Sequence, residues 1–225
     1  VVCSTFFGAV LAALIERIAY QPLLDKGVKR IYLLIAGLGI SIIGENLIVV
    51  MIDGRFHAYK TSLSAMPVSI LGASIGVVDL IILVASAIAL LIVQFLIRKT
   101  RVGLAIRGAA FDLTTASIMG INVRQLILIV FIIAGSMAGL SGVFLGIKYT
   151  AYPTMGNLTN KAFISAVVGG LGSMPGAVVG ALLLGVLETM TSAYVSSALR
   201  NLFAYALLIV ILLIKPTGLM GKSME

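Results

Sequence analysis

The sequence has few of the residues on which soluble enzymes and metalloproteins rely. Only 11% of its 225 residues are charged, and it contains one cysteine and one histidine. Cys3 has no second cysteine with which to form an internal disulfide. His57 lies in a polar stretch with no nearby Cys or His that would complete a metal site. We therefore assign no function to either residue and predict no metal site.

Nucleotide-binding and catalytic motifs are also missing. Gly221-Lys222-Ser223 matches the end of a phosphate-binding GxxxxGK[ST] loop, but Pro216 stands where the first glycine should be. No GxSxG or HExxH sequence occurs, and no two carboxylates stand beside a plausible base. The sequence therefore predicts no enzyme activity and no directly bound cofactor. If ATP drives this protein, ATP and its Mg²⁺ must bind to another chain.

The abundant residues are apolar. The hydrophobic fraction is 60% and the mean hydropathy is +1.18, whereas soluble proteins are about 45–50% apolar. Asp79–Ile97 and Leu126–Ile147 are almost continuously apolar and come close to the roughly 20 residues that a helix needs to cross a bilayer. The apolar runs are rich in Ala and Leu, with Gly added in Leu126–Ile147, and do not alternate as β-barrel strands do. We predict an all-α, polytopic transmembrane helical bundle that forms a single domain over residues 1–225.

The formal net charge of +8 has a membrane explanation. Lys and Arg gather in an early loop over Arg17–Arg30, in a segment over Arg98–Arg124, and in the tail at Lys215 and Lys222. Such clusters beside apolar spans mark the cytoplasmic side. No interleaving of aromatic and basic residues argues for nucleic-acid binding.

This charge rule orders the chain across the membrane. We expect Val1–Ile15 to be the end of a helix that stops at Glu16 and Arg17. The expected elements after it are an inner loop, Arg17–Arg30; a span, Ile31–Ile52; an outer loop, Asp53–Gly76, extended over Met66–Ile75; a span, Asp79–Ile97; the inner segment Arg98–Arg124; a span, Leu126–Ile147; an outer loop, Lys148–Lys161; and a last span with its core at Leu202–Ile214.

The inner segment Arg98–Arg124 is the feature around which the chain is organised. Gly103 and Gly120 bracket a predicted short helix over Leu104–Met119, with Arg107, Asp112 and Thr115 away from its apolar stripe. The stripe consists of Ile106, Ala109, Ala110, Leu113 and Ala116. A short amphipathic helix here is suited either to docking on another protein or to resting in the lipid headgroups.

Two glycine clusters indicate close helix packing. Four glycines at 4-3-4 spacing form a flat seam on one face of Leu126–Ile147, where another helix can approach closely; they are Gly135, Gly139, Gly142 and Gly146. Further on, GGLGSMPG separates the arms Ala162–Val168 and Ala177–Glu188. Its turn formers are Gly169, Gly170, Gly172, Pro175 and Gly176. Two short helices or a re-entrant hairpin both fit, with the turn either inside the assembly or at the cytoplasmic surface.

Two acids lie at or near membrane depth, Glu45 and Glu188. A charge there needs a partner or a wet pathway. They are candidates for a translocation pathway, together with Asn46, and the alternative is that each bonds to a neighbouring helix or lies at the membrane interface.

Several stretches resemble the branched-chain amino acid permeases of ABC transporters. In Arg98–Arg124 the resemblance rests on Gly103, Ala105, Arg107, Asp112, Ala116, Gly120 and Asn122. Elsewhere it rests on Ile15-Glu16-Arg17-Ile18-Ala19-Tyr20-Gln21-Pro22-Leu23, Lys161-Ala162-Phe163, Gly169 to Gly176, Ser192-Ala193-Tyr194 and Lys215-Pro216-Thr217-Gly218. It covers essentially the whole chain in order.

The resemblance implies a multi-pass permease of the bacterial inner membrane that imports branched-chain or related amino acids. It implies partners: ABC ATPase subunits that engage the coupling segment through Gly103, Arg107, Asp112, Thr115 and Gly120, a second identical or homologous permease subunit, and an extracytoplasmic substrate-binding protein. It also implies that further helices precede Val1. The alternatives are an ABC permease for urea, amides or sugars, a secondary transporter with an intramembrane carboxylate, and a non-transporting scaffold.

Overall fold

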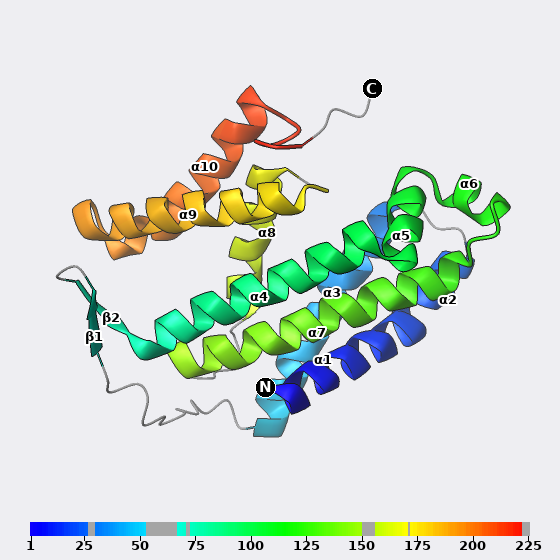
Figure 1. Cartoon of the computed structure of the whole chain (residues 1–225), viewed down its shortest axis with the longest axis horizontal. Helices are drawn as coiled ribbons and strands as arrows, with labels where there is room; N and C mark the ends of the chain where they lie inside the picture. The colour runs from blue at the N-terminus through cyan, green and yellow to red at the C-terminus, as the bar shows by residue number, and fades with distance from the viewer. Residues whose placement is uncertain (27–29, 53–66, 71–72, 150–155, 171, 222–225) are drawn as a thin grey trace. The chain divides into compact units, whose positions relative to one another are not determined.

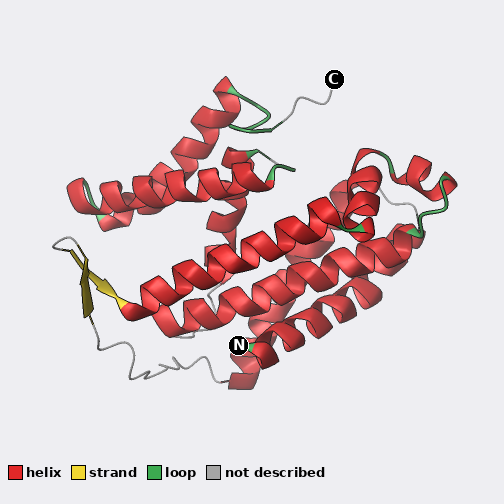
Figure 2. Ribbon diagram, viewed as in Figure 1, coloured by secondary structure: helices red, strands yellow, loops and turns green. Residues whose placement is uncertain are grey.

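The structure is a computed structural model that describes residues 1–26, 30–52, 67–70, 73–149, 156–170 and 172–221. The chain forms two compact units, Val1–Pro153 and Thr154–Glu225, which are described separately below. Both are built almost entirely of helices (Figure 2). His57 lies outside the described residues, and the single membrane domain expected from the sequence stays a prediction.

The first unit begins with one long helical segment. α1 (Val2–Ile15) continues without a break into a π-helical turn, η1 (Glu16–Tyr20), and then into α2 (Gln21–Asp25). The expected stop at Glu16 is therefore wrong, because the Glu16 side chain is buried and not solvated at a helix end. Pro22 is tolerated because it falls in the first turn of α2, where a backbone N–H is not needed.

Three long helices of this unit lie side by side. α7 (Val123–Tyr149) packs along α1 on one flank and contacts α4 (Val77–Lys99) on the other, as Figure 1 shows. α3 (Arg30–Ile52) approaches the first segment where Gly37 faces the hydroxyl of Tyr20. The Tyr20 ring in turn lies 4.8 Å from the ring of Phe131 on α7. These contacts place η1 between α3 and α7.

Two short strands precede α4. β1 (Pro67–Ile70) and β2 (Ala73–Gly76) pair antiparallel, with Pro67 opposite Gly76. The described part of the extended segment expected over Met66–Ile75 forms this strand pair, and β2 leads directly into α4.

The second unit is an antiparallel helical hairpin joined to a further helix. α8 (Asn157–Gly169) and α9 (Met174–Tyr194) form the hairpin, and a 3₁₀ turn, η4 (Ser197–Leu199), leads to α10 (Arg200–Ile214). The small core consists of Ile164, Val168, Leu184 and Ala204. Val168 is completely buried, so the core lies near the turn of the hairpin.

Five helical segments of the described chain are long and apolar enough to cross a membrane. They are Val2–Asp25, Val77–Lys99, Val123–Tyr149, Met174–Tyr194 and Ser197–Ile214. α8 has 13 residues and is roughly 20 Å long, shorter than a hydrocarbon core of about 30 Å. The hairpin therefore has one short and one full-length arm, which differs from the two short helices that the sequence allowed. The chain is a multi-pass membrane protein of the polytopic helical class.

Candidate functional site

The coupling segment begins with a tight corner between α4 and α5 (Arg101–Phe111). Thr100 caps α5 by accepting a hydrogen bond of 3.1 Å from the Gly103 N–H. A Cβ on Gly103 would lie 2.1 Å from the carbonyl oxygen of Ile97, so only glycine fits this corner. Arg107 donates a hydrogen bond to the same carbonyl oxygen. Gly103 and Arg107 therefore fix the direction in which α5 leaves the membrane helix.

Asp112 divides the segment into two helices. Its backbone is extended, with φ −154° and ψ 119°, and its side chain caps α6 (Leu113–Ile118) by accepting hydrogen bonds from Thr114 N at 2.9 Å and Thr115 N at 3.3 Å. The Thr115 hydroxyl also donates to the carboxylate. That hydroxyl bond and the Thr114 bond hold the pKa of Asp112 below its usual value. The single helix expected over Leu104–Met119 is thus two, because Asp is a strong N-cap.

The break also changes which side chains pack. Ala109, Ala116 and Leu126 form a small core, with Ile106 against it. Leu113, which the expected stripe included, is instead 38% exposed, because a bend at Asp112 puts α6 out of phase with α5. Gly120 ends α6 with φ 85°, a conformation that glycine adopts at no steric cost.

Large apolar side chains are left uncovered at the bend and at the end of α6. Phe111, Ile118 and Met119 are 83%, 82% and 80% exposed. They stand on a basic segment that lies outside the candidate spans. An uncovered apolar group of this kind on a cationic segment is suited to contact with another protein.

The glycine seam faces α1. A Cβ on Gly135 would lie 2.4 Å from the carbonyl oxygen of Gly8, and one on Gly139 would lie 2.3 Å from that of Ser4. The Ser4 hydroxyl donates a 2.8 Å hydrogen bond to the Gly139 carbonyl, so the interface has a polar contact as well. Gly146 is buried, whereas no other described atom comes within 4 Å of a Cβ placed on Gly142.

The glycine-rich turn joins the hairpin arms at close range. A Cβ on Gly169 would lie 2.0 Å from the carbonyl oxygen of Gly176. Gly170 and Gly172 both have positive φ, 110° and 89°, and Ser173 caps α9 by accepting from Gly176 N. Pro175 occupies the first turn of α9, where proline is favoured.

The C-terminal segment packs onto this turn. Leu219 N donates to Val168 O and Met220 N donates to Gly169 O, each at 2.9 Å. Gly218 is buried with φ 78°, and Gly170 has no room for a Cβ because Gly221 N would lie 2.4 Å away. The turn is therefore covered by its own chain, an arrangement that the sequence did not predict.

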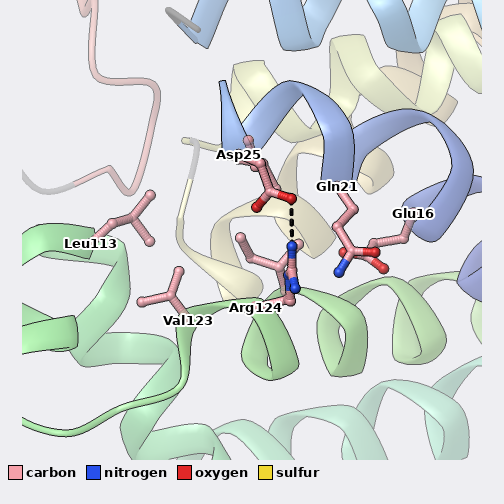
Figure 3. Close-up of a pocket in the computed structure, with 8 residues that line it drawn as sticks. Glu16, Gln21, Asp25, Leu113, Val123 and Arg124 are labelled. Carbon is pink, nitrogen blue, oxygen red and sulfur yellow. Dashed lines mark hydrogen bonds and ion pairs between the residues drawn. The ribbon is translucent and has the colours of Figure 1, made fainter. Parts of the chain in front are cut away.

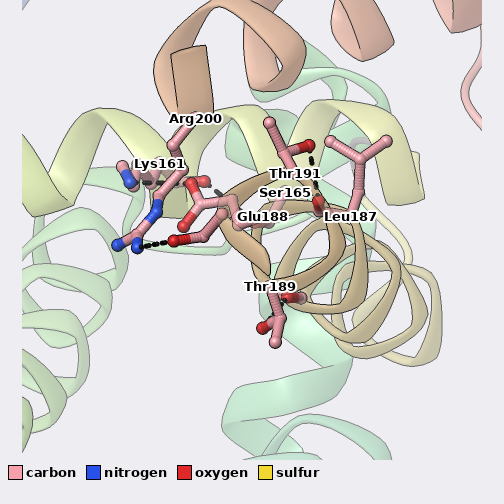
Figure 4. A network of polar contacts seen from close by, with 9 residues as sticks. Lys161, Ser165, Leu187, Glu188, Thr189, Thr191 and Arg200 are labelled. Atoms are coloured by element: carbon pink, nitrogen blue, oxygen red, sulfur yellow. Dashed lines mark hydrogen bonds and ion pairs between the residues drawn. The ribbon is translucent and has the colours of Figure 1, made fainter. Parts of the chain in front are cut away.

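Glu188 belongs to a polar cluster where α8, α9 and α10 meet (Figure 4). Lys161 Nζ lies 2.7 Å from Glu188 Oε1, at an angle that makes the contact an ion pair and not an aligned hydrogen bond. The two side chains are 26% and 17% exposed. Arg200 donates to the Ser192 hydroxyl at 2.9 Å, and Ser192 lies 3.0 Å from the hydroxyl of Ser197.

The other pathway candidates have simpler surroundings. Asn46 is exposed and donates to the Ile42 carbonyl of its own helix at 2.8 Å, which satisfies the amide locally. Glu45 is partly buried on α3. Glu45 lies in the first unit and Glu188 in the second. Their part in translocation stays a prediction.

Sequence reasoning missed Glu16, which is 2% exposed and is the most buried charged residue of the described chain. It also missed Ser4, Gly8 and Ala12, the small residues at four-residue spacing that face the seam. That spacing is itself a membrane-helix packing signal and would have identified them. Within the described ranges, no three His, Cys, Asp or Glu residues come together as a metal site requires.

Comparisons with known proteins agree with this architecture. Residues 1–212 match the family described as "Branched-chain amino acid transport system / permease component". The chain is 37% identical to the high-affinity branched-chain amino acid transport system permease protein LivH of Escherichia coli K12, over 98% of this chain and 75% of that protein.

Two further relatives differ in what they cover. The corresponding BraD protein of Pseudomonas aeruginosa is 36% identical over 92% of this chain and 69% of its own length. The xylose transport system permease protein XylH of Escherichia coli K12 is 34% identical, but over only 42% of this chain. No solved structure matches the chain. The family match spans both units, the coupling segment and the hairpin, and the chain belongs to the branched-chain amino acid transport permease family.

Proposed function

We propose that this chain is the membrane-spanning permease subunit of an ATP-driven ABC importer in the bacterial inner membrane. Its cargo would be branched-chain or related amino acids, which are the substrates named for the LivH and BraD relatives. An extracytoplasmic binding protein would deliver the amino acid, and a second permease subunit, identical or homologous, would complete the pathway. No nucleic acid is involved.

The observation that carries this proposal is the uncovered apolar group on the coupling segment. Phe111 is exposed at the bend before Asp112, and Ile118 and Met119 are exposed at the end of α6, the helix that Asp112 caps. Arg107 bonds to the Ile97 carbonyl at the end of α4 and Asp112 caps α6, so these side chains connect both short helices to the membrane helix. An ATPase subunit that binds these side chains could therefore push on α4 and α7 directly.

The alternative is a secondary transporter that uses an intramembrane carboxylate. Glu188, the candidate in the second unit, is held in an ion pair with Lys161 at 2.7 Å. The match to the xylose permease covers less than half of the chain, so it supports a sugar as cargo more weakly.

The decisive experiment is reconstitution into proteoliposomes with the partner ATPase, a second permease subunit and the binding protein. We expect uptake of radiolabelled leucine that requires ATP and does not respond to an imposed proton gradient. Uptake by the isolated chain in a proton or sodium gradient would instead establish the secondary transporter.

Docking is tested with Phe111→Ala, and Phe95→Ala is its matched control. Phe95 is also exposed, at 64%, but lies within the α4 span. We expect Phe111→Ala to weaken ATPase binding and ATP-dependent uptake, because aromatic anchors dominate interfaces. Asp112→Lys should have a larger effect, since it removes the α6 cap and reverses the charge. Wild-type binding and uptake in both coupling-segment variants would exclude the segment as the ATPase dock.

A further inference from the structure

A cavity of about 300 Å³ lies beside the coupling segment within the first unit (Figure 3). It is formed where η1 and α2 face the beginning of α6 and of α7. Its volume is at the lower end of the range of small-molecule pockets, about 300–1,000 Å³, and is suited to a ligand of amino-acid size. In the orientation predicted from the basic residues, the cavity lies on the cytoplasmic side.

The innermost polar group is the carboxylate of Glu16. The residue is 2% exposed, and its Oε1 has no hydrogen-bond partner among the described residues. Figure 3 shows this side chain pointing from η1 toward Gln21, into the space that the lining residues enclose. A buried carboxylate without a partner is strongly unfavourable, so the site calls for a cationic hydrogen-bond donor. Its position on a π-helical turn is also common for functional residues.

An opposite charge stands at the mouth of the same cavity. Arg124 pairs with Asp25 through one guanidinium nitrogen, and both side chains are more than half exposed. Because a guanidinium has five N–H donors, Arg124 can bind a second carboxylate while it holds Asp25. The cavity thus offers an anionic group at depth and a cationic group at its entrance.

Between the charged groups the wall is apolar, formed by Leu24, Leu113, Val123 and Ile127. We propose that this cavity binds a free amino acid with an apolar side chain. Its ammonium group would lie against Glu16, its carboxylate against Arg124, and its side chain against Leu113 and Val123. The class of ligand rests on the proposed function. The amino acid would occupy this site after crossing the membrane and would touch α6 through Leu113.

Direct binding to the purified permease–ATPase complex, without the binding protein, tests the site. Tritiated L-leucine is the probe, measured by scintillation proximity. We expect saturable binding that Glu16→Gln weakens about tenfold or more, because a charge-assisted hydrogen bond is lost while side-chain size is kept. Asp79→Asn is the control: it also converts an acid to its amide, but Asp79 belongs to an exposed ion pair with Lys148 at the start of α4 and does not line the cavity.

Two competitors separate the ends of the ligand. 3-Methylbutylamine keeps the ammonium group and 4-methylpentanoate keeps the carboxylate. The amine should compete with labelled leucine in the wild type and not in Glu16→Gln. Competition by the acid should be weakened by Arg124→Gln and unchanged by Glu16→Gln. Val123→Phe, which leaves Glu16 intact and fills the cavity, should also abolish leucine binding. It keeps the test informative if Glu16→Gln does not fold.

The proposal is overturned if the wild-type complex binds no leucine at millimolar concentration, or if Glu16→Gln and Val123→Phe both bind it as the wild type does. If either result is found together with ATP-dependent leucine uptake, the binding site is refuted and the proposed transport function stands. Leucine binding that depends on Glu16, without ATP-driven uptake, would support the site and refute the proposed transport mechanism.

Discussion

Replacing Gly139 by alanine should destabilise the first unit, whereas the same change at Gly142 should not. Both glycines lie on α7 and belong to the predicted seam. The added methyl carbon of Gly139→Ala would lie 2.3 Å from the Ser4 carbonyl oxygen, but no described atom comes within 4 Å of that of Gly142→Ala. The pair therefore isolates the effect of close helix approach.

The magnitude follows from two opposing contributions. Alanine is favoured over glycine in a helix interior by about 1 kcal/mol, and this gain is common to both variants. At Gly139, α1 and α7 must also separate by about 1 Å to restore normal contact, and such overpacking costs about 1–3 kcal/mol. Separation also lengthens the Ser4–Gly139 hydrogen bond, now 2.8 Å. We expect Gly139→Ala to be less stable than Gly142→Ala by about 1–3 kcal/mol.

Thermal stability in detergent provides the measurement. Each variant is heated in steps, and the fraction that remains monodisperse is quantified by size-exclusion chromatography. A difference of about 1–3 kcal/mol corresponds to several degrees in a unit of this size. Gly139→Leu, with a larger side chain at the same place, should fail to fold or assemble. Equal melting of the two alanine variants, or purification of Gly139→Leu with wild-type stability, would refute the packing of α1 on α7.

Three further predictions follow from the capped and paired groups. Because the pKa of Asp112 is lowered from 3.8, the α6 cap should be fully present above that pH and lost as the pH falls below it. Asp112→Ala should therefore speed hydrogen exchange of the coupling segment at pH 7. The difference from wild type should persist down to pH 5. Gly170→Ala should release the C-terminal segment to proteases more than Gly172→Ala, which adds backbone strain without a clash; equal cleavage of the two would exclude the packing of the tail on the turn. Lys161→Met and Glu188→Gln should destabilise the second unit less together than the sum of their separate effects; strictly additive losses of melting temperature would show that the ion pair contributes nothing.

The sequence by itself determined the class of protein. Apolar runs near 20 residues can satisfy their backbone groups in a bilayer only as helices, so their length and composition predicted the helical bundle. The basic residues predicted a polar segment between α4 and α7. Gly120 follows its last helix as expected, whereas Gly103, expected to precede the first helix, lies within α5. These features are local, since each depends on residues within a few turns of one another.

The tertiary structure decided which groups meet. Gly139 and Ser4 are 135 residues apart, and no periodicity within α7 shows that α1 supplies its partner. The burial of Glu16 depends on α2, α6 and α7 closing around it, and the sequence alone placed that acid at an exposed helix end. Asp112 lies between these cases, because its capping propensity is local but the apolar stripe around it also fits an unbroken helix. The structure has the broken form, in which Ala109 and Ala116 pack with Leu126 while Leu113, on the same predicted stripe, is exposed.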